Sequence, residues 1–266
     1  MSGVKVEVLH AQSCPAWQAV ASRIRELARS EGITVDLSDA AVETPDEAAE
    51  RRLDGQRQHW SDVLECRADR YGAEASAPAE YAVERFVRAG AHDLLELGAG
   101  QGRDSLSFAQ CGFSVQALDF AESGVLAISA KAREACLQDS LHASTHDCRE
   151  PLPFADNSFD ACYSHMLYCM ALTTAQLTAL SAEVLRVLRP GGIQVYTVRS
   201  TADPDCGAGI ACGDGLYESS GFIVHFFSRE LVELLARGFE LVDVTEFEEG
   251  DLPHRLFRVT LLKPAT

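Results

Sequence analysis

Hydrophobic and polar residues follow two different periods along the chain. Apolar residues in short runs or at every second position predict strands, and apolar residues three or four positions apart predict helices. From residue 78 to residue 238 the two patterns alternate regularly. The expected helices cover 78–90, 101–112, 121–138, 173–188 and 228–238, and the expected strands cover 93–97, 114–120, 140–147, 159–167 and 193–200.

Two alternating segments close the chain, at 239–250 and 254–263, and they predict an antiparallel β-hairpin. Regular alternation of strands and helices is typical of a doubly wound α/β sheet. We therefore expect an α/β fold whose mostly parallel, seven-stranded sheet ends in this hairpin. Residues 200–221 contain a glycine-rich stretch and are expected to form a loop.

A smaller unit precedes this domain. Its strand patterns lie at 4–10 and 33–39, and its helical patterns lie at 15–32 and 44–52. Residues 1–54 are therefore expected to form a β-α-β-α unit that is too small to be stable alone. The main domain is expected over residues 55–266.

Composition narrows the class of protein. The chain has 266 residues, and 47% of them are hydrophobic, which is enough for a full core. It has no apolar run of about 18 residues, and its first ten residues lack the pattern of a signal peptide. Nine cysteines occur without a C-x-x-C motif, so we expect a reducing compartment and no metal site. These features predict a soluble, cytoplasmic protein that has no membrane partner.

The net charge of −17 bears on the kind of partner. A protein that binds along a nucleic-acid backbone needs clustered cations, and this acidic balance argues against such a partner. We expect a small-molecule substrate and no nucleic acid.

Residues 96–104, "ELGAGQGRD", place three glycines in five positions between an expected strand and an expected helix. Gly98 is expected to make the turn, Gly100 to let a ligand approach the backbone, and Gly102 to start the helix close to the sheet. Asp119 ends the next strand, 21 positions after Gly98, where a carboxylate accepts both hydroxyls of a ribose. The pattern predicts a nucleoside site, and a glycine turn without any ligand is the alternative.

The spacing of the loop indicates which nucleoside it binds. A dinucleotide motif needs its third glycine at position 103, which is an arginine here. Glu96 faces the loop, and a carboxylate there repels a pyrophosphate and attracts an ammonium group. The Tyr-x-x-x-Lys pair of reductases is absent, because none of Lys5, Lys131 and Lys263 has a tyrosine four positions earlier. S-adenosylmethionine carries an ammonium and a sulfonium, so it is the expected cofactor.

Four segments of the sequence strengthen this interpretation. "LLELGAGQGRDSL", "VQALDF", "HDCREPLPFADNSFDACYSHML" and "EVLRVLRPGGIQVYTV" resemble class I S-adenosylmethionine-dependent methyltransferases of the small-molecule type, over roughly residues 55–266. "GQGRDSL" is similar to tellurite-resistance and thiol methyltransferases. The segment "SHML" stands where enzymes that methylate amino groups of DNA bases carry Asn/Asp-Pro-Pro-aromatic, which again disfavours a nucleic-acid substrate.

The resemblance implies cofactor contacts at the matching positions. Around the methionine end it implies contacts from Glu96, Gly98, Gly100 and Gly102, from the carbonyl of Ser164 to the ammonium, and from Tyr71 to the carboxylate. Around the nucleoside it implies that Asp119 holds the ribose, that Phe120 lies against the adenine, and that Asp147 and the backbone of Cys148 contact the adenine amino group. Packing on the sheet is the alternative role for Tyr71 and the preferred role for Trp60.

The methyl acceptor is expected at the carboxyl ends of the strands, where ligands bind in such sheets. Methyl transfer mainly requires alignment of the nucleophile and exclusion of water, and a base is needed only for an acceptor that is protonated at neutral pH. His165, Tyr168 and Arg199 are the catalytic candidates by position, with His165 as the base. A hydrogen-bonded structural role for His165 and a carboxylate partner for Arg199 are the alternatives. His225 is a further candidate to face the site.

Two other functions stay open at this stage. Cys206 and Cys212 lie in the glycine-rich segment and could capture a soft metalloid, which would suit a detoxifying metalloid or thiol methyltransferase. Alternatively, the chain could bind S-adenosylmethionine as a sensor without turnover.

The first residues, "VKVEVLHAQSCPAW", resemble the opening of thioredoxin-like domains, in which a strand leads to Cys-Pro at a helix start. Trp17 stands at the position of the second cysteine, so dithiol exchange is excluded. We expect residues 1–54 to be a partial thioredoxin-like, structural segment that docks on the catalytic domain or on a second subunit, which would give a homodimer. The alternative is that Cys14 delivers a thiophilic substrate.

Overall fold

The protein is described from a computed structural model that covers residues 4–11, 17–42, 55–56, 58–65, 72, 74–219, 221–250 and 254–265. The chain divides into two compact units, Met1–Asp54 and Gly55–Thr266. Each unit is described by itself below.

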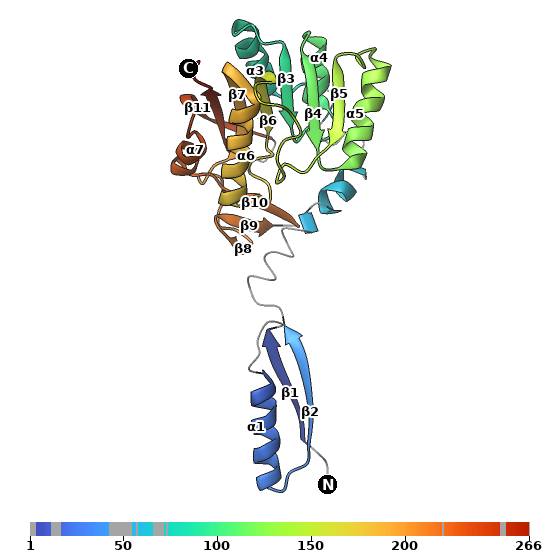
Figure 1. Ribbon diagram of the computed structural model, residues 1–266, viewed down its shortest axis with the longest axis vertical. Coiled ribbons are helices and arrows are strands. Elements are labelled where there is room, and N and C mark those ends of the chain that lie inside the picture. The colour runs from blue at the N-terminus through green and yellow to red at the C-terminus, as the bar shows by residue number, and fades with distance from the viewer. Residues whose placement is uncertain are drawn as a thin grey trace. The chain divides into compact units, whose positions relative to one another are not determined.

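The larger unit is built on a seven-stranded sheet with the order β11-β12-β7-β6-β3-β4-β5 (Figure 1). Its strands are β3 (Asp93–Leu97), β4 (Ser114–Asp119), β5 (Leu141–Thr145), β6 (Phe159–His165), β7 (Leu188–Arg199), β11 (Glu240–Glu249) and β12 (His254–Leu262). The strands from β3 to β7 pair in parallel, and β12 is antiparallel to both of its neighbours. The expected mostly parallel sheet with a closing hairpin is confirmed.

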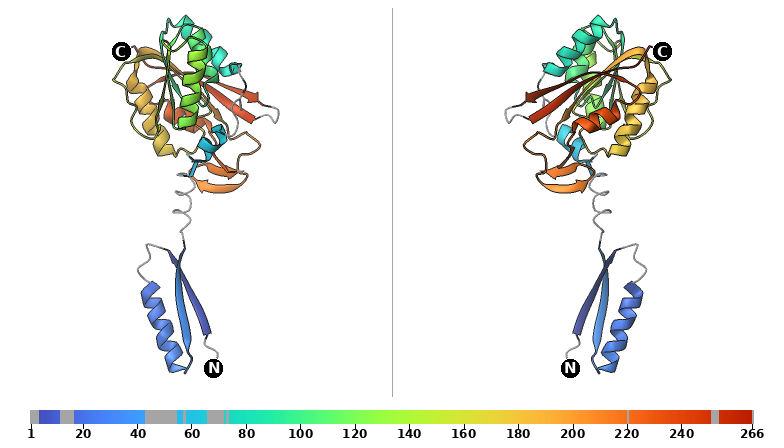
Figure 2. Two further views of the ribbon diagram at one scale, coloured as in Figure 1. Left: turned by 90° about the vertical axis from the view of Figure 1, so that its right-hand side faces the viewer. Right: turned by 90° about the vertical axis from the view of Figure 1, so that its left-hand side faces the viewer.

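Helices cover both faces of this sheet. They are α3 (Ala77–Arg88), α4 (Arg103–Gln110), α5 (Glu122–Glu134), α6 (Thr174–Val187) and α7 (Arg229–Leu235). One core cluster joins α3, α4 and α5 to the sheet, and the other joins α6 and α7 to the opposite face. Figure 2 shows the gold α6 across the sheet from the teal and green helices. The two faces follow from strand alternation, which sends neighbours such as Leu94 and Leu95 into different clusters.

Caps fix where several helices begin. The Ser76 side chain accepts a hydrogen bond from the backbone N–H of Ala79 at the start of α3. Thr173 and Gln176 form a reciprocal capping box at the start of α6. Each cap of this kind is worth about 1 kcal/mol, and it sets the first turn of a helix that packs on the sheet.

The expectation of one loop over residues 200–221 is wrong. Three short strands, β8 (Ile210–Gly213), β9 (Leu216–Ser219) and β10 (Phe222–His225), form a separate antiparallel sheet there. Asp214 and Gly215 both have positive φ values, 51° and 75°, and they turn the chain between β8 and β9. An Asp-Gly pair is a strong hairpin signal, but the flanking glycines hide the strand pattern around it.

The smaller unit contains β1 (Val4–Ala11), α1 (Trp17–Ser30) and β2 (Val35–Val42), and the two strands pair in parallel. The helix predicted at 44–52 lies outside the described residues, as does Cys14. In the described part of the chain, no helix is both long enough and apolar enough to span a bilayer.

Candidate cofactor site

The glycine-rich loop joins the end of β3 to the start of α4. Gly98 and Gly102 have φ values of 73° and 81°, and an added Cβ would lie 2.8 Å from Leu167 Cβ and 2.6 Å from Ile128 Cγ1, respectively. Both glycines are therefore required by packing. Gly100 also has a positive φ of 55°, but an added Cβ there would meet no described atom within 4 Å. Its open side leaves room for a ligand.

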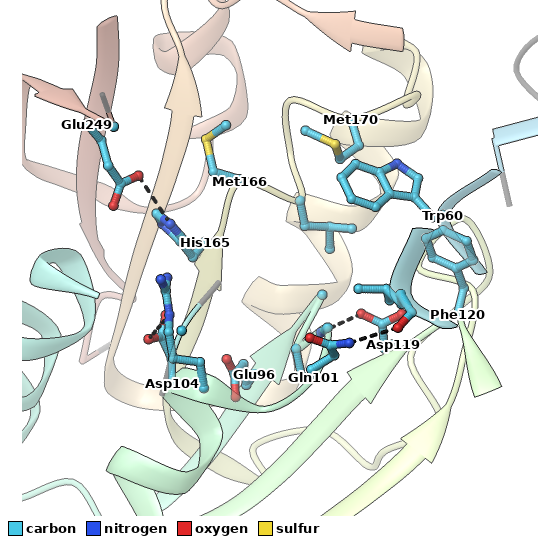
Figure 3. Close-up of a pocket in the computed structure, with 18 of the residues that line it drawn as sticks. Trp60, Glu96, Gln101, Asp104, Asp119, Phe120, His165, Met166, Met170 and Glu249 are labelled. Carbon is cyan, nitrogen blue, oxygen red and sulfur yellow. Dashed lines mark hydrogen bonds and ion pairs between the residues drawn. The ribbon is translucent and has the colours of Figure 1, made fainter. Parts of the chain in front are cut away.

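A cavity of about 470 Å³ opens beside this loop (Figure 3). Its lining includes the loop itself, the end of β4 at Asp119 and Phe120, and the end of β6 at His165. Small-molecule sites commonly have volumes of 300 to about 1,000 Å³. The cavity thus lies at the carboxyl ends of the parallel strands and has the size of a cofactor site.

Asp119 is buried and connects two parts of the cavity wall. Its Oδ2 accepts a hydrogen bond of 2.7 Å from the backbone N–H of Gly100, and its Oδ1 accepts one of 2.9 Å from Ala121. Burial raises the pKa of Asp119 to about 6, although the backbone hydrogen bonds act in the opposite direction. The carboxylate is therefore held in place before any ligand arrives.

Glu96 is also buried, with 3% of its surface exposed. The Ser105 hydroxyl donates a hydrogen bond to its Oε2. Burial, together with the negative charges of Asp104 and Asp119, raises the pKa of Glu96 to about 8. At neutral pH its carboxyl therefore holds a proton, which a cationic ligand would displace.

Asp104 is a third buried acid on the cavity wall, at a position for which the sequence predicted no role. Its two oxygens accept hydrogen bonds of 2.8 Å each, one from the backbone N–H of Ser76 and one from the Ser76 hydroxyl. The Tyr163 hydroxyl donates another, at 3.2 Å. The only signal for Asp104 in the sequence was its place in the segment "GQGRDSL".

His165 forms the opposite end of the cavity. Its Nδ1 lies 2.8 Å from Thr197 Oγ1, and its Nε2 lies 3.3 Å from Glu249 Oε2. Figure 3 shows Glu249 and His165 pointing toward each other, on the opposite side of the drawn site from Asp119. Glu249 also lines the cavity, and no sequence pattern near it indicated this position.

An apolar wall lies between these polar ends. Met166, Leu167, Met170 and Trp60 line it, and Met166 has a positive φ of 66°. The Trp60 ring centroid also lies 5.0 Å from that of Phe222 in β10. Trp60 therefore packs on β10 of the small sheet and lines the cavity as well.

The helical segment 58–65 is tied to two parts of this wall. The Gln101 side chain donates a hydrogen bond of 2.8 Å to the Leu64 carbonyl. Gln56, just before the segment, donates to the Gly221 carbonyl at 2.9 Å and accepts from the Ile223 N–H at 3.0 Å. These bonds join the glycine-rich loop to the small sheet through one short helix.

Two catalytic candidates lie outside the cavity lining. Tyr168 is fully buried, its ring stacks on Tyr196 with centroids 4.8 Å apart, and its hydroxyl accepts a hydrogen bond from Gln194. Arg199 forms ion pairs with Asp203 and Asp205. Arg199 ends β7 and Tyr168 lies in the turn just past β6, but the carboxylates of Asp203 and Asp205 hold Arg199 and the core holds Tyr168 in structural contacts.

The other predicted residues have the following places. Asp147 forms a salt bridge of 2.7 Å with Arg149. Cys148 and Ser164 are buried and are not among the described residues that line the cavity. Tyr71 lies outside the described residues. His225 is buried, and its Nδ1 lies 2.8 Å from the Leu172 carbonyl. Cys206 packs against the core and Cys212 lies on β8, and neither is among the described lining residues.

Comparisons with known proteins identify one matching domain within the chain. Residues 94–192 match the profile of a family described as "Methyltransferase domain". A comparison with curated proteins finds no significant match.

Solved structures with this fold include a SAM-dependent methyltransferase from Methanosarcina mazei, which is 20% identical with a TM-score of 0.58, over 65% of this chain and 93% of that chain. A 1,6-didemethyltoxoflavin-N1-methyltransferase from Burkholderia thailandensis, solved with S-adenosylhomocysteine, is 21% identical with a TM-score of 0.60, over 85% and 93%. The (4+2)-cyclase SpnF is 18% identical with a TM-score of 0.60, over 85% and 98%.

At these identities the structures show a shared fold, and the matched profile adds the domain type. Residues 94–192 thus match a methyltransferase domain, and the chain shares the fold of S-adenosylmethionine-dependent methyltransferases.

Proposed function

We propose that the protein transfers a methyl group from S-adenosylmethionine to a small-molecule acceptor by in-line displacement in a closed pocket. The observation that carries this proposal is a set of three buried carboxylates, from Glu96, Asp104 and Asp119, around the glycine-rich loop. Arg103 Nε lies 3.3 Å from Asp104 and offsets one of these acids, but Glu96 and Asp119 have raised pKa values because their ionised forms are costly to bury. Such a site favours a cationic ligand.

The residues present fit this cofactor. Glu96 and Asp104 lie where an ammonium group and a sulfonium would be stabilised, whereas the diphosphate of a dinucleotide would meet three acids. The open side of Gly100 allows the ligand to approach the backbone. Bound S-adenosylmethionine supplies a methyl group that is already activated on sulfur.

We assign the residue roles on the same grounds. Asp119 is proposed to accept the ribose hydroxyls, and Phe120 to contact the adenine, because both line the cavity next to the loop. Arg103 is the proposed partner of the cofactor carboxylate, since it lines the same cavity, although its Nε also contacts Asp104 at 3.3 Å.

If Asp147 contacts the adenine, its carboxylate is shared between the adenine amino group and Arg149. The cofactor contacts of Cys148, Ser164 and Tyr71 stay predictions.

Two kinds of side chain are proposed to act on the acceptor. The apolar wall of Met166, Met170 and Trp60 excludes water and aligns the acceptor with the methyl group. His165 and Glu249 lie together at the polar end, where an acceptor that is protonated at neutral pH would lose its proton. We do not include Tyr168 and Arg199, because both are engaged in structural contacts.

Calorimetric titration tests the cofactor part of the proposal. S-adenosylhomocysteine is expected to bind with one site per chain, and NADH is expected not to bind. Saturation by NADH with no response to S-adenosylhomocysteine would overturn the proposal. Formation of S-adenosylhomocysteine in the presence of candidate acceptors then separates an enzyme from a sensor. The metalloid or thiol alternative gains support if a thiol or metalloid is the acceptor.

We also propose that residues 1–54 mediate a homodimer. The described part of this unit is one helix with a two-stranded parallel sheet, and parallel sheets are stable mainly when both faces are covered. Val20 and Leu27 on α1 are 48% and 50% exposed. Sedimentation of the full chain and of a variant that lacks residues 1–54 tests this, because only the full chain is expected to sediment as a dimer.

A further inference from the structure

Three side chains from three strands form a hydrogen-bonded chain at the polar end of the cavity. The backbone N–H of Met166 donates to Thr197 Oγ1 at 3.1 Å, so the hydroxyl hydrogen of Thr197 is available to His165 Nδ1 at 2.8 Å. A neutral imidazole that accepts at Nδ1 carries its proton on Nε2. That nitrogen lies 3.3 Å from Glu249 Oε2. The network thus favours a tautomer that donates to Glu249.

The surroundings keep the Glu249 carboxyl ionised. Burial would raise its pKa, but the hydrogen bond from His165 and the nearby Arg103 and His254 outweigh burial and hold the pKa below its ordinary value. The contact with His165 uses Oε2, and the side chain is 34% exposed and lines the cavity. Its other oxygen has no hydrogen bond to the residues that the structure describes, and we infer that it is available to a ligand.

The charges around the cavity indicate the kind of acceptor. Four acids line it, Glu96, Asp104, Asp119 and Glu249, against two bases, Arg103 and Lys131. S-adenosylmethionine contributes two positive charges and one negative charge. Once the cofactor ammonium has displaced the proton of Glu96, one negative charge stays uncompensated when the histidines are neutral. A cationic acceptor is therefore favoured, and an anionic acceptor is disfavoured.

The rest of the acceptor would contact apolar, adaptable side chains. Two of the three methionines of the chain, Met166 and Met170, line the cavity beside Trp60. Methionine fills irregular spaces and contacts aromatic rings favourably. This wall therefore favours an acceptor with an apolar body, whose shape can vary, over an acceptor with many hydroxyl groups.

We propose that the acceptor is a small amine on an apolar body, and that Glu249, positioned by His165 and Thr197, binds its ammonium group and takes one proton from it. This inference rests on the proposed methyl transfer. It names Glu249 as a catalytic residue, and His165 and Thr197 as the residues that position it.

The step balances as follows. The ammonium gives one proton to Glu249, and the resulting nitrogen lone pair forms the new bond to the methyl carbon. The bond between carbon and sulfur breaks, and its electron pair stays on sulfur. The product is a methylated ammonium, and Glu249, whose low pKa lets it hold the proton only transiently, passes that proton to water. A free amine has a pKa near that of lysine, about 10.4, so a proton acceptor at the site is needed at neutral pH.

The test uses four probes that share a phenylethyl group and differ in the head group attached to it. Phenethylamine, 2-phenylethanol, 2-phenylethanethiol and 3-phenylpropionate are titrated into the protein saturated with S-adenosylhomocysteine. The amine is expected to bind about tenfold or more tightly than the carboxylate, which is the scale of one hydrogen bond to a charged group. Equal or tighter binding of the carboxylate, or binding of the thiol alone, would overturn the inference.

Matched variants locate the effect. Glu249→Gln is expected to remove the preference for the amine and to keep the affinity for S-adenosylhomocysteine. Glu248→Gln changes the neighbouring residue, whose side chain is 58% exposed and lies 3.5 Å from Arg255, and it is expected to keep the preference. A preference that survives in Glu249→Gln contradicts the inference.

Turnover gives a second readout, measured with phenethylamine as acceptor. Thr197→Val is expected to shift the acid limb of kcat/KM against pH, since it removes the partner of His165 Nδ1. Loss of kcat with an unchanged pH profile would argue for a merely structural role. The two proposals fail separately: no binding of S-adenosylhomocysteine rejects the proposed function, whereas binding without any amine preference rejects only the amine inference.

Discussion

The carboxylate of Asp119 accepts a 2.7 Å hydrogen bond from the backbone N–H of Gly100. This bond joins the end of β4 to Gly100, the most open point of the glycine-rich loop. Asp119, the proposed ribose ligand, and the loop are therefore held together. The same carboxylate accepts from Ala121 and thereby fixes the start of α5. A change at Asp119 is therefore expected to alter loop geometry and ligand binding together.

Asp119→Asn is expected to weaken S-adenosylhomocysteine binding by about 10- to 100-fold. The reason is the loss of charge-assisted hydrogen bonds to the ribose, which are worth about 1.5–3 kcal/mol each. Asp139→Asn, at an exposed position, is the control and should bind normally. Calorimetric titration measures both. Unchanged affinity in the Asp119 variant would remove this residue from the proposed cofactor site.

The pH dependence of cofactor binding reports on Glu96. Burial raises the pKa of Glu96 to about 8, and an ammonium group binds the ionised form. Below pH 8 the ligand must displace a proton, so affinity is expected to fall by up to about tenfold per pH unit. Titrations in two buffers of different ionisation enthalpy should show the release of close to one proton at pH 7. Glu96→Gln should abolish this release, and a pH-independent affinity in the wild-type protein would contradict the prediction.

The same carboxyl should lower the stability of the ligand-free protein at high pH. The folded-state pKa of Glu96 is about 8, above the ordinary 4.5, so the folded state binds more protons between these values. Its contribution to stability is present at low pH and is lost as the pH rises through 8. Relative to the wild type, Glu96→Gln is expected to gain unfolding free energy between pH 5 and pH 9. Urea denaturation without ligand measures this, and saturating S-adenosylhomocysteine should reduce the difference.

Gly100 and Gly102 should respond differently to alanine. In Gly102→Ala the new Cβ would lie 2.6 Å from Ile128 Cγ1. This overlap should lower the free energy of unfolding by about 1–3 kcal/mol, in addition to the effect of the backbone strain. Gly112→Ala isolates the strain, since Gly112 has a φ of 92° and open space around it. Gly100→Ala should match Gly112→Ala in stability but lose cofactor affinity. Thermal unfolding and titration together decide this, and an equal loss of stability in all three variants would contradict it.

Much of the fold could be predicted from the sequence, because its elements have clear periods. Leu94, Leu95 and Leu97 form a short apolar run that predicts β3, and Asp119 follows at the distance expected for a ribose ligand. Local spacing carries such information because neighbouring parallel strands end at the same edge of the sheet. The small sheet β8-β9-β10 was missed, since strands of four residues among several glycines resemble a loop.

The acceptor end was harder to predict for a physical reason. Glu249 approaches His165 only because β11 pairs with β12, β12 with β7 and β7 with β6. Such a long-range contact leaves no local pattern in the sequence. Tyr168 shows the converse, since it lies just past the correct strand end but its side chain points into the core.

Gln56 should control the helical segment that lies on the cavity wall. Its side chain bonds the carbonyl of Gly221 and the N–H of Ile223, and it is only 8% exposed. Gln56→Ala leaves both backbone groups without this partner, at a cost of about 1–3 kcal/mol for each buried group. We expect faster amide hydrogen exchange in residues 58–65 and weaker binding of S-adenosylhomocysteine, because Trp60 and Leu64 line the cavity.

Gln58→Ala provides the matched control for this prediction. The Gln58 side chain is exposed and bonds Asp62 within the same helical segment. Its loss should cost a few tenths of a kcal/mol and leave the contact with β10 intact, as is usual for surface substitutions. If the amide hydrogens of residues 58–65 exchange equally fast in both variants, the segment is held by its own helical hydrogen bonds. If only Gln56→Ala exchanges faster, the small sheet holds this part of the cavity wall in place, and mutations in β10 should then change cofactor affinity without touching the ligand.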